Sequence, residues 1–291
     1  MNKIEFGDCR DTMRRWATEG VKAQMCVTSP PYFGLRDYGH DEQIGLEQTP
    51  EQYIAAMVEV FRCVRDVLAD DGTLWLNIGD SYGGGKQLLG IPWRVALALQ
   101  ADGWVLRQDI IWHKPNPMPE SVRDRCTKAH EYIFLLSKSE RYFFHSEAMK
   151  EASVDPKGSA KRYEAPFWQN GKHQTGGYSA NGAKHTAGIK SFDGTRNRRS
   201  VWSVATRPYK GAHFAIFPPA LIEPCILAGS RPGDIVLDPF MGSGTTAAVS
   251  VQHGRQYIGC ELNPEYGPLQ EQRIKEVQQS LKDDQLSLVL E

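Results

Sequence analysis

The chain has 291 residues, 41% of them hydrophobic and 24% charged, and a formal net charge of −1. This length and composition suffice for one sizeable hydrophobic core with a small additional lobe. No long apolar run is present and the first six residues lack the pattern of a signal peptide, so we expect a cytoplasmic protein with no membrane segment. The six cysteines show no Cys-x-x-Cys spacing, which argues against a zinc site or a disulfide framework and predicts reduced core thiols.

Apolar patterns predict strands and helices that alternate along the chain. Short apolar runs predict strands at residues 23–27, 73–78, 108–112, 234–238 and 256–260. Helical stripes predict helices at residues 50–68 and 92–101. Residues 131–136 and 141–144 are expected to pair as an antiparallel hairpin. This alternation predicts an α/β fold with a three-layer, mostly parallel sheet.

A proline-rich tetrad, Ser29-Pro30-Pro31-Tyr32, follows the predicted strand at residues 23–27. Prolines end a strand and donate no backbone hydrogen bond, so this loop is stiff. Enzymes of the α/β class place their chemistry at such strand ends. The tetrad therefore predicts a rigid polar slot beside an aromatic ring, although a plain proline turn would have the same sequence.

A second motif combines a buried strand, a glycine loop and a helix. Asp238-Pro239-Phe240 closes the predicted strand, and Met241-Gly242-Ser243-Gly244-Thr245-Thr246 precedes an Ala/Val-rich helical stretch. Glycines in such a loop let the backbone approach a nucleotide-type cofactor closely. The loop lacks the lysine of a Walker loop, and it matches a dinucleotide fingerprint only in its permissive form.

The two motifs in this order resemble the S-adenosylmethionine-dependent DNA amino-methyltransferases of the permuted (beta) class, whose catalytic tetrad precedes the cofactor loop. Similar motifs are Gly7-Asp8-Cys9, Trp112-His113-Lys114-Pro115-Asn116 and His213-Phe214-Ala215-Ile216-Phe217-Pro218. The resemblance implies a Rossmann-like methyltransferase fold with an antiparallel hairpin. It also implies a catalytic half at residues 1–149, a target-recognition insertion at 150–210 and a cofactor-binding half at 211–291.

The resemblance assigns roles to individual residues. Ser29, Pro30, Pro31 and Tyr32 are expected to act on a flipped base, with Ser29 Oγ and the Pro30 carbonyl accepting the amino hydrogens while Tyr32 stacks on the ring. Glu261 is expected to bind the ribose hydroxyls and Asp8 the adenine amino group, although each acid also fits a helix cap or a surface position. The expected cofactor-binding residues are Asp8, Thr28, Phe217, Pro218, Asp238, Pro239, Phe240, Gly242, Ser243, Gly244, Thr245 and Glu261. No metal ion is expected.

Residues 150–210 carry most of the positive charge. They hold twelve Lys and Arg residues against four Asp and Glu residues, so the rest of the chain is acidic. Aromatic residues are interleaved with the basic ones: Tyr163, Phe167, Trp168, Tyr178, Phe192 and Trp202. The pattern predicts a face for double-stranded DNA, with a solvated surface insertion as the alternative.

Two motifs are assigned minor roles. Pro224-Cys225 matches the nucleophile dipeptide of cytosine-C5 methyltransferases, but it lies in an apolar helix-like stretch where a thiol is expected to be buried and inert. Lys114 is expected either to touch DNA phosphate or to be solvent-exposed.

The predicted activity is transfer of a methyl group to cytosine N4, because serine opens the tetrad, with adenine N6 as the alternative. An NAD-dependent oxidoreductase is a more distant alternative, since it would use the same glycine loop. A non-catalytic DNA-binding module and methylation of RNA or of a protein glutamine also remain open. A cognate restriction endonuclease is a candidate partner, and the chain is expected to be a monomer or homodimer.

Overall fold

The computed structural model describes residues 1–37, 39, 43–154, 193–206 and 217–289. Within them the chain divides into two compact units. The larger one comprises Met1–Ala148 and Arg199–Glu291, and the smaller one comprises Met149–Arg198.

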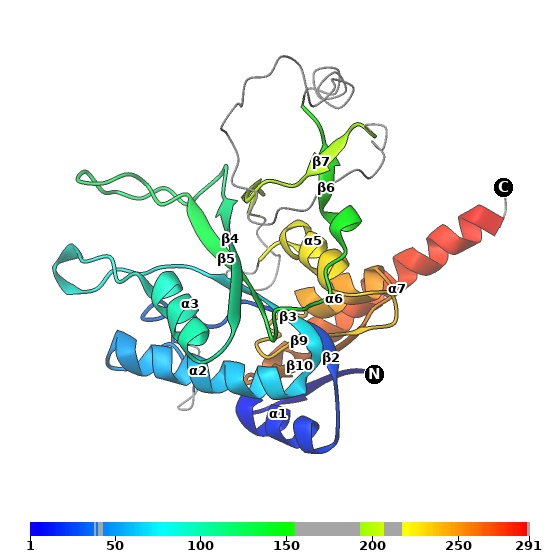
Figure 1. The fold of residues 1–291 in the computed structure, drawn as a ribbon, viewed down its shortest axis with the longest axis horizontal. Coiled ribbons are helices and arrows are strands. Elements are labelled where there is room, and N and C mark those ends of the chain that lie inside the picture. The colour runs from blue at the N-terminus through cyan, green and yellow to red at the C-terminus, as the bar shows by residue number, and fades with distance from the viewer. Residues whose placement is uncertain (38, 40–42, 155–192, 207–216, 290–291) are drawn as a thin grey trace, which may run out of the picture. The chain divides into compact units, whose positions relative to one another are not determined.

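The larger unit is built on one mixed sheet, seen near the middle of Figure 1. Its strands among the described residues, in spatial order, are β1 (Asn2–Phe6), β10 (Gln256–Glu261), β9 (Ile235–Asp238), β2 (Ala23–Thr28), β3 (Leu68–Ile78), β5 (His130–Ser137), β4 (Val105–His113) and β8 (Val201–Ser203). β1, β10, β9, β2 and β3 run parallel, while β5 is antiparallel to both β3 and β4. The carboxyl ends of the parallel strands consequently meet at one edge of the sheet.

Helices cover both faces of this sheet (Figure 1). On one face lie α1 (Cys9–Thr18), α2 (Pro50–Val67) and α3 (Ile91–Ala101), and on the other lie α5 (Pro219–Gly229), α6 (Thr245–Gln252) and α7 (Gly267–Val289). Short 3-10 turns are η1 (Gly84–Lys86), η2 (Ser146–Met149) and η3 (Pro264–Tyr266). Helix α2 begins with a capping box, in which the Thr49 hydroxyl accepts from the Gln52 backbone N–H and the Gln52 side chain accepts from the Thr49 N–H. The fold is therefore the three-layer α/β arrangement that the alternation predicts.

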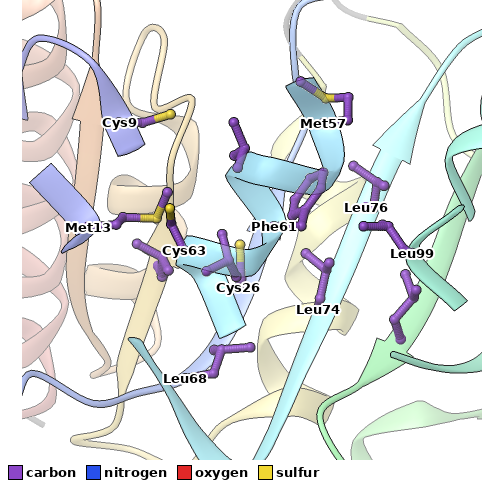
Figure 2. Close-up of a cluster of buried hydrophobic side chains, with 14 of the residues drawn as sticks. Cys9, Met13, Cys26, Met57, Phe61, Cys63, Leu68, Leu74, Leu76 and Leu99 are labelled. Carbon is purple, nitrogen blue, oxygen red and sulfur yellow. The ribbon is translucent and has the colours of Figure 1, made fainter. Parts of the chain in front are cut away.

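The main core fills the space between α1, α2, α3 and the sheet. Figure 2 shows Met57, Phe61 and Cys63 from α2 among side chains of the neighbouring strands and helices, including Leu74 and Leu76 of β3. These five side chains are at most 5% exposed. Close packing of this kind holds the strands in register and makes the positions of the strand ends rigid.

The predicted hairpin between residues 131–136 and 141–144 is wrong. Residues 141–144 form no strand, and β5 instead pairs on its two sides with β3 and β4. Because both edges of β5 are occupied, the following chain leaves the sheet, and its aromatic residues pack on other groups. Phe144 stacks on Trp75 with ring centroids 6.3 Å apart. The antiparallel hairpin of this fold is the β4–β5 pair.

The smaller unit contains a two-stranded antiparallel sheet, β6 (Lys150–Ala152) paired with β7 (Thr195–Asn197). The larger unit resumes at Arg199, and β8 pairs there with β4, so residues 199–206 of the expected recognition insertion belong to that unit. Tyr163, Phe167, Trp168, Tyr178 and Phe192 lie outside the described residues.

Trp202 does not fit the expectation of an aromatic residue available to DNA. It belongs to β8, is 5% exposed, and donates its indole N–H to the Arg199 carbonyl. The thiols also differ in one case from the prediction, because Cys126 is exposed whereas the other five cysteines are buried. Among the helices of the described residues, none is long and apolar enough to cross a membrane.

Candidate active site

Polar side chains gather where four neighbouring parallel strands end. Thr28 ends β2, Asp238 ends β9 and Glu261 ends β10, while Asp8 follows β1 by two residues. The Gly7 N–H donates to the Glu261 carbonyl at 2.9 Å, which ties the ends of β1 and β10 together. The expected tetrad and the expected cofactor loop therefore share one edge of the sheet.

Asp238 is a buried carboxylate at the centre of this edge. Its Oδ1 accepts hydrogen bonds from the Thr28 hydroxyl at 2.6 Å and from the Phe240 N–H at 3.0 Å, and its Oδ2 accepts from the Thr246 hydroxyl at 2.6 Å. Burial raises the pKa of Asp238 to about 6, and the three hydrogen bonds limit the rise. The carboxylate thereby fastens β2, the loop after β9 and helix α6 to one another.

The glycine loop after Asp238 needs glycine at two positions. Gly242 has φ 52° and Gly244 has φ 81°, both in the left-handed region that favours glycine. A Cβ on Gly244 would lie 3.2 Å from Gln270 Cα, whereas a Cβ on Gly242 would meet nothing closer than the Phe240 carbonyl at 3.9 Å. Gly244 is thus fixed by packing against α7, and Gly242 faces open space.

Glu261 holds this loop from the end of β10. Its Oε2 accepts from the Gly242 N–H at 2.7 Å and its Oε1 from the Asn263 N–H at 2.9 Å. Burial raises the pKa of Glu261, and these backbone hydrogen bonds oppose the rise. A carboxylate has about four acceptor sites, so lone pairs remain beside these backbone hydrogen bonds for the hydroxyl groups of a ligand.

Asp8 takes the helix-cap role that the sequence left open. Its Oδ1 accepts from the Arg10 N–H at 2.7 Å at the start of α1, and its Oδ2 pairs with the Arg10 guanidinium at 2.5 Å. Burial raises the pKa of Asp8, but the hydrogen bonds and charge of Arg10 outweigh that effect and hold it below its ordinary value.

The remaining expected cofactor residues fall into two groups. The Ser243 and Thr245 hydroxyls accept hydrogen bonds from Arg273 of α7, so these side chains brace the loop. Pro218 is buried at the start of α5, and Phe217 before it is half-buried, as is Phe240, while Pro239 is buried.

The tetrad forms the loop after β2. Pro30 is buried, Ser29 is half-buried, and the Pro31 carbonyl accepts from the Tyr53 hydroxyl at 2.9 Å. Ser29 Oγ lies 3.3 Å from the Tyr32 hydroxyl. Tyr53 of α2 thus holds the tetrad loop in place, in addition to the stiffness that two prolines give the loop.

Tyr32 joins the tetrad to residues that the sequence reasoning missed. Its hydroxyl donates to Glu131 Oε2 at 2.7 Å and lies 3.3 Å from Asn77 Oδ1. Burial, followed by the charge of Glu131, raises the pKa of Tyr32 well above its ordinary value. Gly79 makes room for the ring, since a Cβ there would lie 2.6 Å from Tyr32 Cε2.

Lys114 and Cys225 both lie in the larger unit, one after β4 and the other in α5. Lys114 is 19% exposed and pairs with Glu131, so it is not the plainly solvent-exposed lysine of the alternative expectation, and its contact with DNA phosphate stays a prediction. Cys225 is fully buried in α5 as expected, and its thiol contacts the Leu221 carbonyl at 3.6 Å. One sequence signal for Glu131 was available, namely an acidic residue at the start of a buried apolar strand.

Comparison with known proteins decides what this site belongs to. The model of a family described as DNA methylase, which covers N6 and N4 methyltransferases, matches residues 23–272. The chain belongs to this family. It is 45% identical to the type II methyltransferase M.SmaI of Serratia marcescens over 94% of this chain and 90% of that protein. It is 44% identical to the type II methyltransferase M.Cfr9I of Citrobacter freundii over 92% of this chain and 86% of that protein.

Solved structures of DNA methylases share the fold. The cytosine-N4-specific PvuII DNA methyltransferase superposes with a TM-score of 0.66 at 19% identity, covering 96% of this chain and 90% of that one. A putative DNA modification methylase from Thermus thermophilus, complexed with S-adenosyl-L-methionine, gives 0.61 at 22% identity and covers 95% and 96%. The M1.HpyAVI complex with the same cofactor gives 0.58 at 19% identity and covers 94% and 99%. The predicted Rossmann-like methyltransferase fold is thereby confirmed.

Proposed function

We propose that this DNA methylase transfers a methyl group from S-adenosylmethionine to cytosine N4 at a specific sequence in double-stranded DNA. One observation carries the proposal. The 2.6 Å hydrogen bond between Thr28 and Asp238 joins the strand that ends in the tetrad to the strand that ends in the glycine loop. A base held by the tetrad and a cofactor held by the loop would then meet at a single sheet edge, which direct transfer between them requires.

The residues at this edge fit the cofactor. Gly7 has φ 125° and Gly242 has φ 52°, and a Cβ at either would find no atom closer than 3.9 Å, so a ligand has room to approach the backbone there. Glu261 offers carboxylate lone pairs to ribose hydroxyls. Glu261 adds negative charge, which suits a cofactor with a cationic sulfonium better than one with a pyrophosphate, whereas the charge of Asp8 is already paired with Arg10. When bound, S-adenosylmethionine supplies a methyl group on an activated sulfur leaving group.

The chain's own task is to make a poor nucleophile reactive. The lone pair of an exocyclic amine is delocalised into the base. Ser29 Oγ and the Pro30 carbonyl, both at the end of β2, accept the two amino hydrogens and hold the nitrogen toward tetrahedral geometry. Positioning and electrostatics then supply the rate, with no covalent intermediate.

The target amine is inaccessible inside a duplex, so the nucleotide must leave the base stack. Tyr32 is the aromatic residue beside Ser29, and its hydroxyl is held by Glu131 at 2.7 Å. A ring fixed in this way offers a stacking face at little cost in conformational entropy. We assign Tyr32 this stacking role.

We assign binding of the duplex to residues 150–210, whose sequence contains twelve Lys and Arg residues and only four Asp and Glu residues. Residues 155–192 and 207–210 of that segment lie outside the described residues, so its support is the charge pattern. The type II names of M.Cfr9I and M.SmaI support a cognate restriction endonuclease acting on the same sequence.

The target base follows from the first tetrad residue. Serine in this position resembles cytosine-N4 methylases, and the PvuII enzyme that shares the fold is cytosine-N4-specific. Adenine N6 is the second candidate, since the family includes both activities.

Mass spectrometry of nucleosides from DNA methylated in vitro tests the assignment. N4-methylcytosine is expected, and it should be absent when Ser29→Ala protein is used. N6-methyladenine alone would overturn the target base. Neither product from the wild-type protein, with cofactor and duplex DNA present, would overturn the activity itself.

A further inference from the structure

A chain of hydrogen bonds runs from the tetrad into the sheet. Ser29 Oγ lies 3.3 Å from the Tyr32 hydroxyl, and the Tyr32 hydroxyl lies 2.7 Å from Glu131 Oε2. The other oxygen of Glu131 is paired with the Lys114 ammonium. The chain therefore begins at the group proposed to hold the amine and ends at a carboxylate that is 14% exposed.

The Glu131 carboxylate is held in one orientation. Oε2 also accepts from Asn77 Nδ2 at 3.3 Å, and the same amide donates to the Tyr132 carbonyl at 3.1 Å. Lys114, which holds Oε1, lies 4.4 Å above the centre of the Trp112 ring. This ammonium compensates the charge of a carboxylate that burial would otherwise penalise.

An ionised carboxylate only accepts hydrogen bonds, and this fixes the direction of the chain. Tyr32 has one proton, and its shortest contact is the 2.7 Å bond to Glu131, so it donates there. The Tyr32 oxygen is then an acceptor toward Ser29, and the Ser29 hydroxyl must donate to it. The lone pairs of Ser29 Oγ are left facing away from its own proton.

We propose that Glu131 is a positioning residue that acts through Tyr32 to make the Ser29 hydroxyl an obligate hydrogen-bond acceptor for the target amine. The inference rests on the proposed role of Ser29. A serine hydroxyl is by itself neutral and ambivalent, able to donate or accept. Because Ser29 donates its proton to Tyr32, the Ser29 oxygen can only accept from the target amine. Hydrogen bonds in such a chain also polarise one another, so the negative charge of Glu131 strengthens Ser29 as an acceptor. The tetrad, which begins with a neutral serine, is thereby linked to a carboxylate through Tyr32.

Glu131→Gln tests the proposal because it keeps the shape of the side chain while it removes the negative charge and changes the hydrogen bonding. An amide has donors as well as an acceptor, so Tyr32 can accept from it and the direction of the chain is lost. We expect the single-turnover rate of methyl transfer to fall about tenfold to a hundredfold, the range of one charged hydrogen bond. Cofactor and DNA affinities, measured by titration, should change by less than about threefold, because neither ligand is bound by Glu131.

The matched control is Glu5→Gln. Glu5 is also a partly buried glutamate on a strand, paired with Lys3 and 25% exposed, and it accepts a hydrogen bond from Trp16. This variant measures what loss of a paired carboxylate costs in general, and its transfer rate should remain close to the wild-type rate.

Tyr32→Phe provides a second, independent break in the chain. It keeps the ring and removes the hydroxyl whose partners are Ser29, Asn77 and Glu131. Its transfer rate should fall as much as that of Glu131→Gln, and adding Glu131→Gln to it should lower the rate by less than about twofold, since a broken chain cannot be broken again.

Three results would overturn the inference. One is a Glu131→Gln rate close to wild type, the second is a Tyr32→Phe rate close to wild type, and the third is a Glu131→Gln effect that is equally large with and without the Tyr32 hydroxyl. Failure of the proposed function would give a different result, because Ser29→Ala would then retain activity. An inactive Ser29→Ala with a fully active Glu131→Gln would remove this inference alone.

Discussion

Thr28 and Asp238 are 210 residues apart in the sequence and are joined by a hydrogen bond of 2.6 Å between the Thr28 hydroxyl and Asp238 Oδ1. Both side chains are at most 1% exposed. β2 and β9 are adjacent parallel strands, so the bond lies where the tetrad loop and the glycine loop depart from the sheet. A change at either residue should therefore be felt in both loops.

Thr28→Val should destabilise the protein and loosen the cofactor loop. Valine has nearly the shape of threonine but cannot donate, so the buried Asp238 carboxylate loses one of its three partners. We expect a loss of about 1–3 kcal/mol in the free energy of unfolding, measured by denaturant titration, and weaker S-adenosylmethionine binding. Thr28→Ser keeps the hydroxyl and is the control. Equal stability of the valine and serine variants would contradict this reading.

The raised pKa of Asp238 predicts a pH-dependent contribution to stability. Its pKa is about 6 in the folded protein and 3.8 ordinarily, so the folded state binds the proton more tightly. The resulting stabilisation is fully present below about pH 4 and is lost as the pH rises through about 6. The difference between these pKa values corresponds to about 3 kcal/mol.

Asp238→Asn isolates this contribution. The asparagine variant has no proton to bind, so the wild-type stability minus the variant stability should decrease by about 2 kcal/mol between pH 4 and pH 7. Chemical denaturation of both proteins across that range measures the difference, and titrations of other groups largely cancel. A difference that stays constant with pH would show that Asp238 has an ordinary pKa in the folded protein.

The fold could be read from the sequence where local patterns suffice. The apolar runs at residues 23–27 and 256–260 and the helical stripe at 50–68 correspond to β2, β10 and α2 within one or two residues. Residues 141–144 have the same aromatic-rich pattern as a strand, yet form none. Whether such a segment becomes a strand depends on whether a sheet edge is available to pair with it. β5 has no available edge, because it pairs with β3 on one side and with β4 on the other. That competition is between distant segments, and a local pattern does not contain it.

The site divides in the same way. Ser29, Asp238 and Glu261 follow predicted strands, and adjacency of parallel strand ends is enough to bring them to one edge. Glu131 and Lys114 lie on β5 and next to β4, and their pairing depends on the register that sets His113 opposite His130. Nothing in the sequence fixes that register in advance.

The glycine loop predicts two different results for its two glycines. Gly242→Ala places a Cβ at φ 52° where it would meet only the Phe240 carbonyl, at 3.9 Å, so only backbone strain of about 1–2 kcal/mol should affect stability, while a ligand approaching the backbone would be blocked. Affinity for S-adenosylmethionine, measured by calorimetry, should fall by at least about tenfold, the effect of 1.4 kcal/mol. Gly254→Ala, at φ 70° with no atom within 4 Å, is the matched control.

Gly244→Val should lose stability as well as affinity for the cofactor. The Cβ of this valine would lie 3.2 Å from Gln270 Cα, which is the reason for the expected loss of stability.

The comparison of Gly242→Ala with Gly254→Ala can contradict the placement of the cofactor. If Gly242→Ala bound the cofactor as tightly as Gly254→Ala did, the cofactor would not lie against this part of the loop.

Gly79→Ala should impair catalysis without affecting the cofactor site. The added Cβ would lie 2.6 Å from Tyr32 Cε2, so the ring must move, and its hydroxyl must then shift relative to Ser29 and Glu131. Misplacement of a positioning group by about 1 Å can cost about a hundredfold in rate, so a large fall in single-turnover methyl transfer is expected while S-adenosylmethionine still binds. Gly84→Ala, which meets no atom within 4 Å, is the control and should leave the rate unchanged. Equal rates for the two alanine variants would mean that the position of the Tyr32 ring does not matter to the reaction.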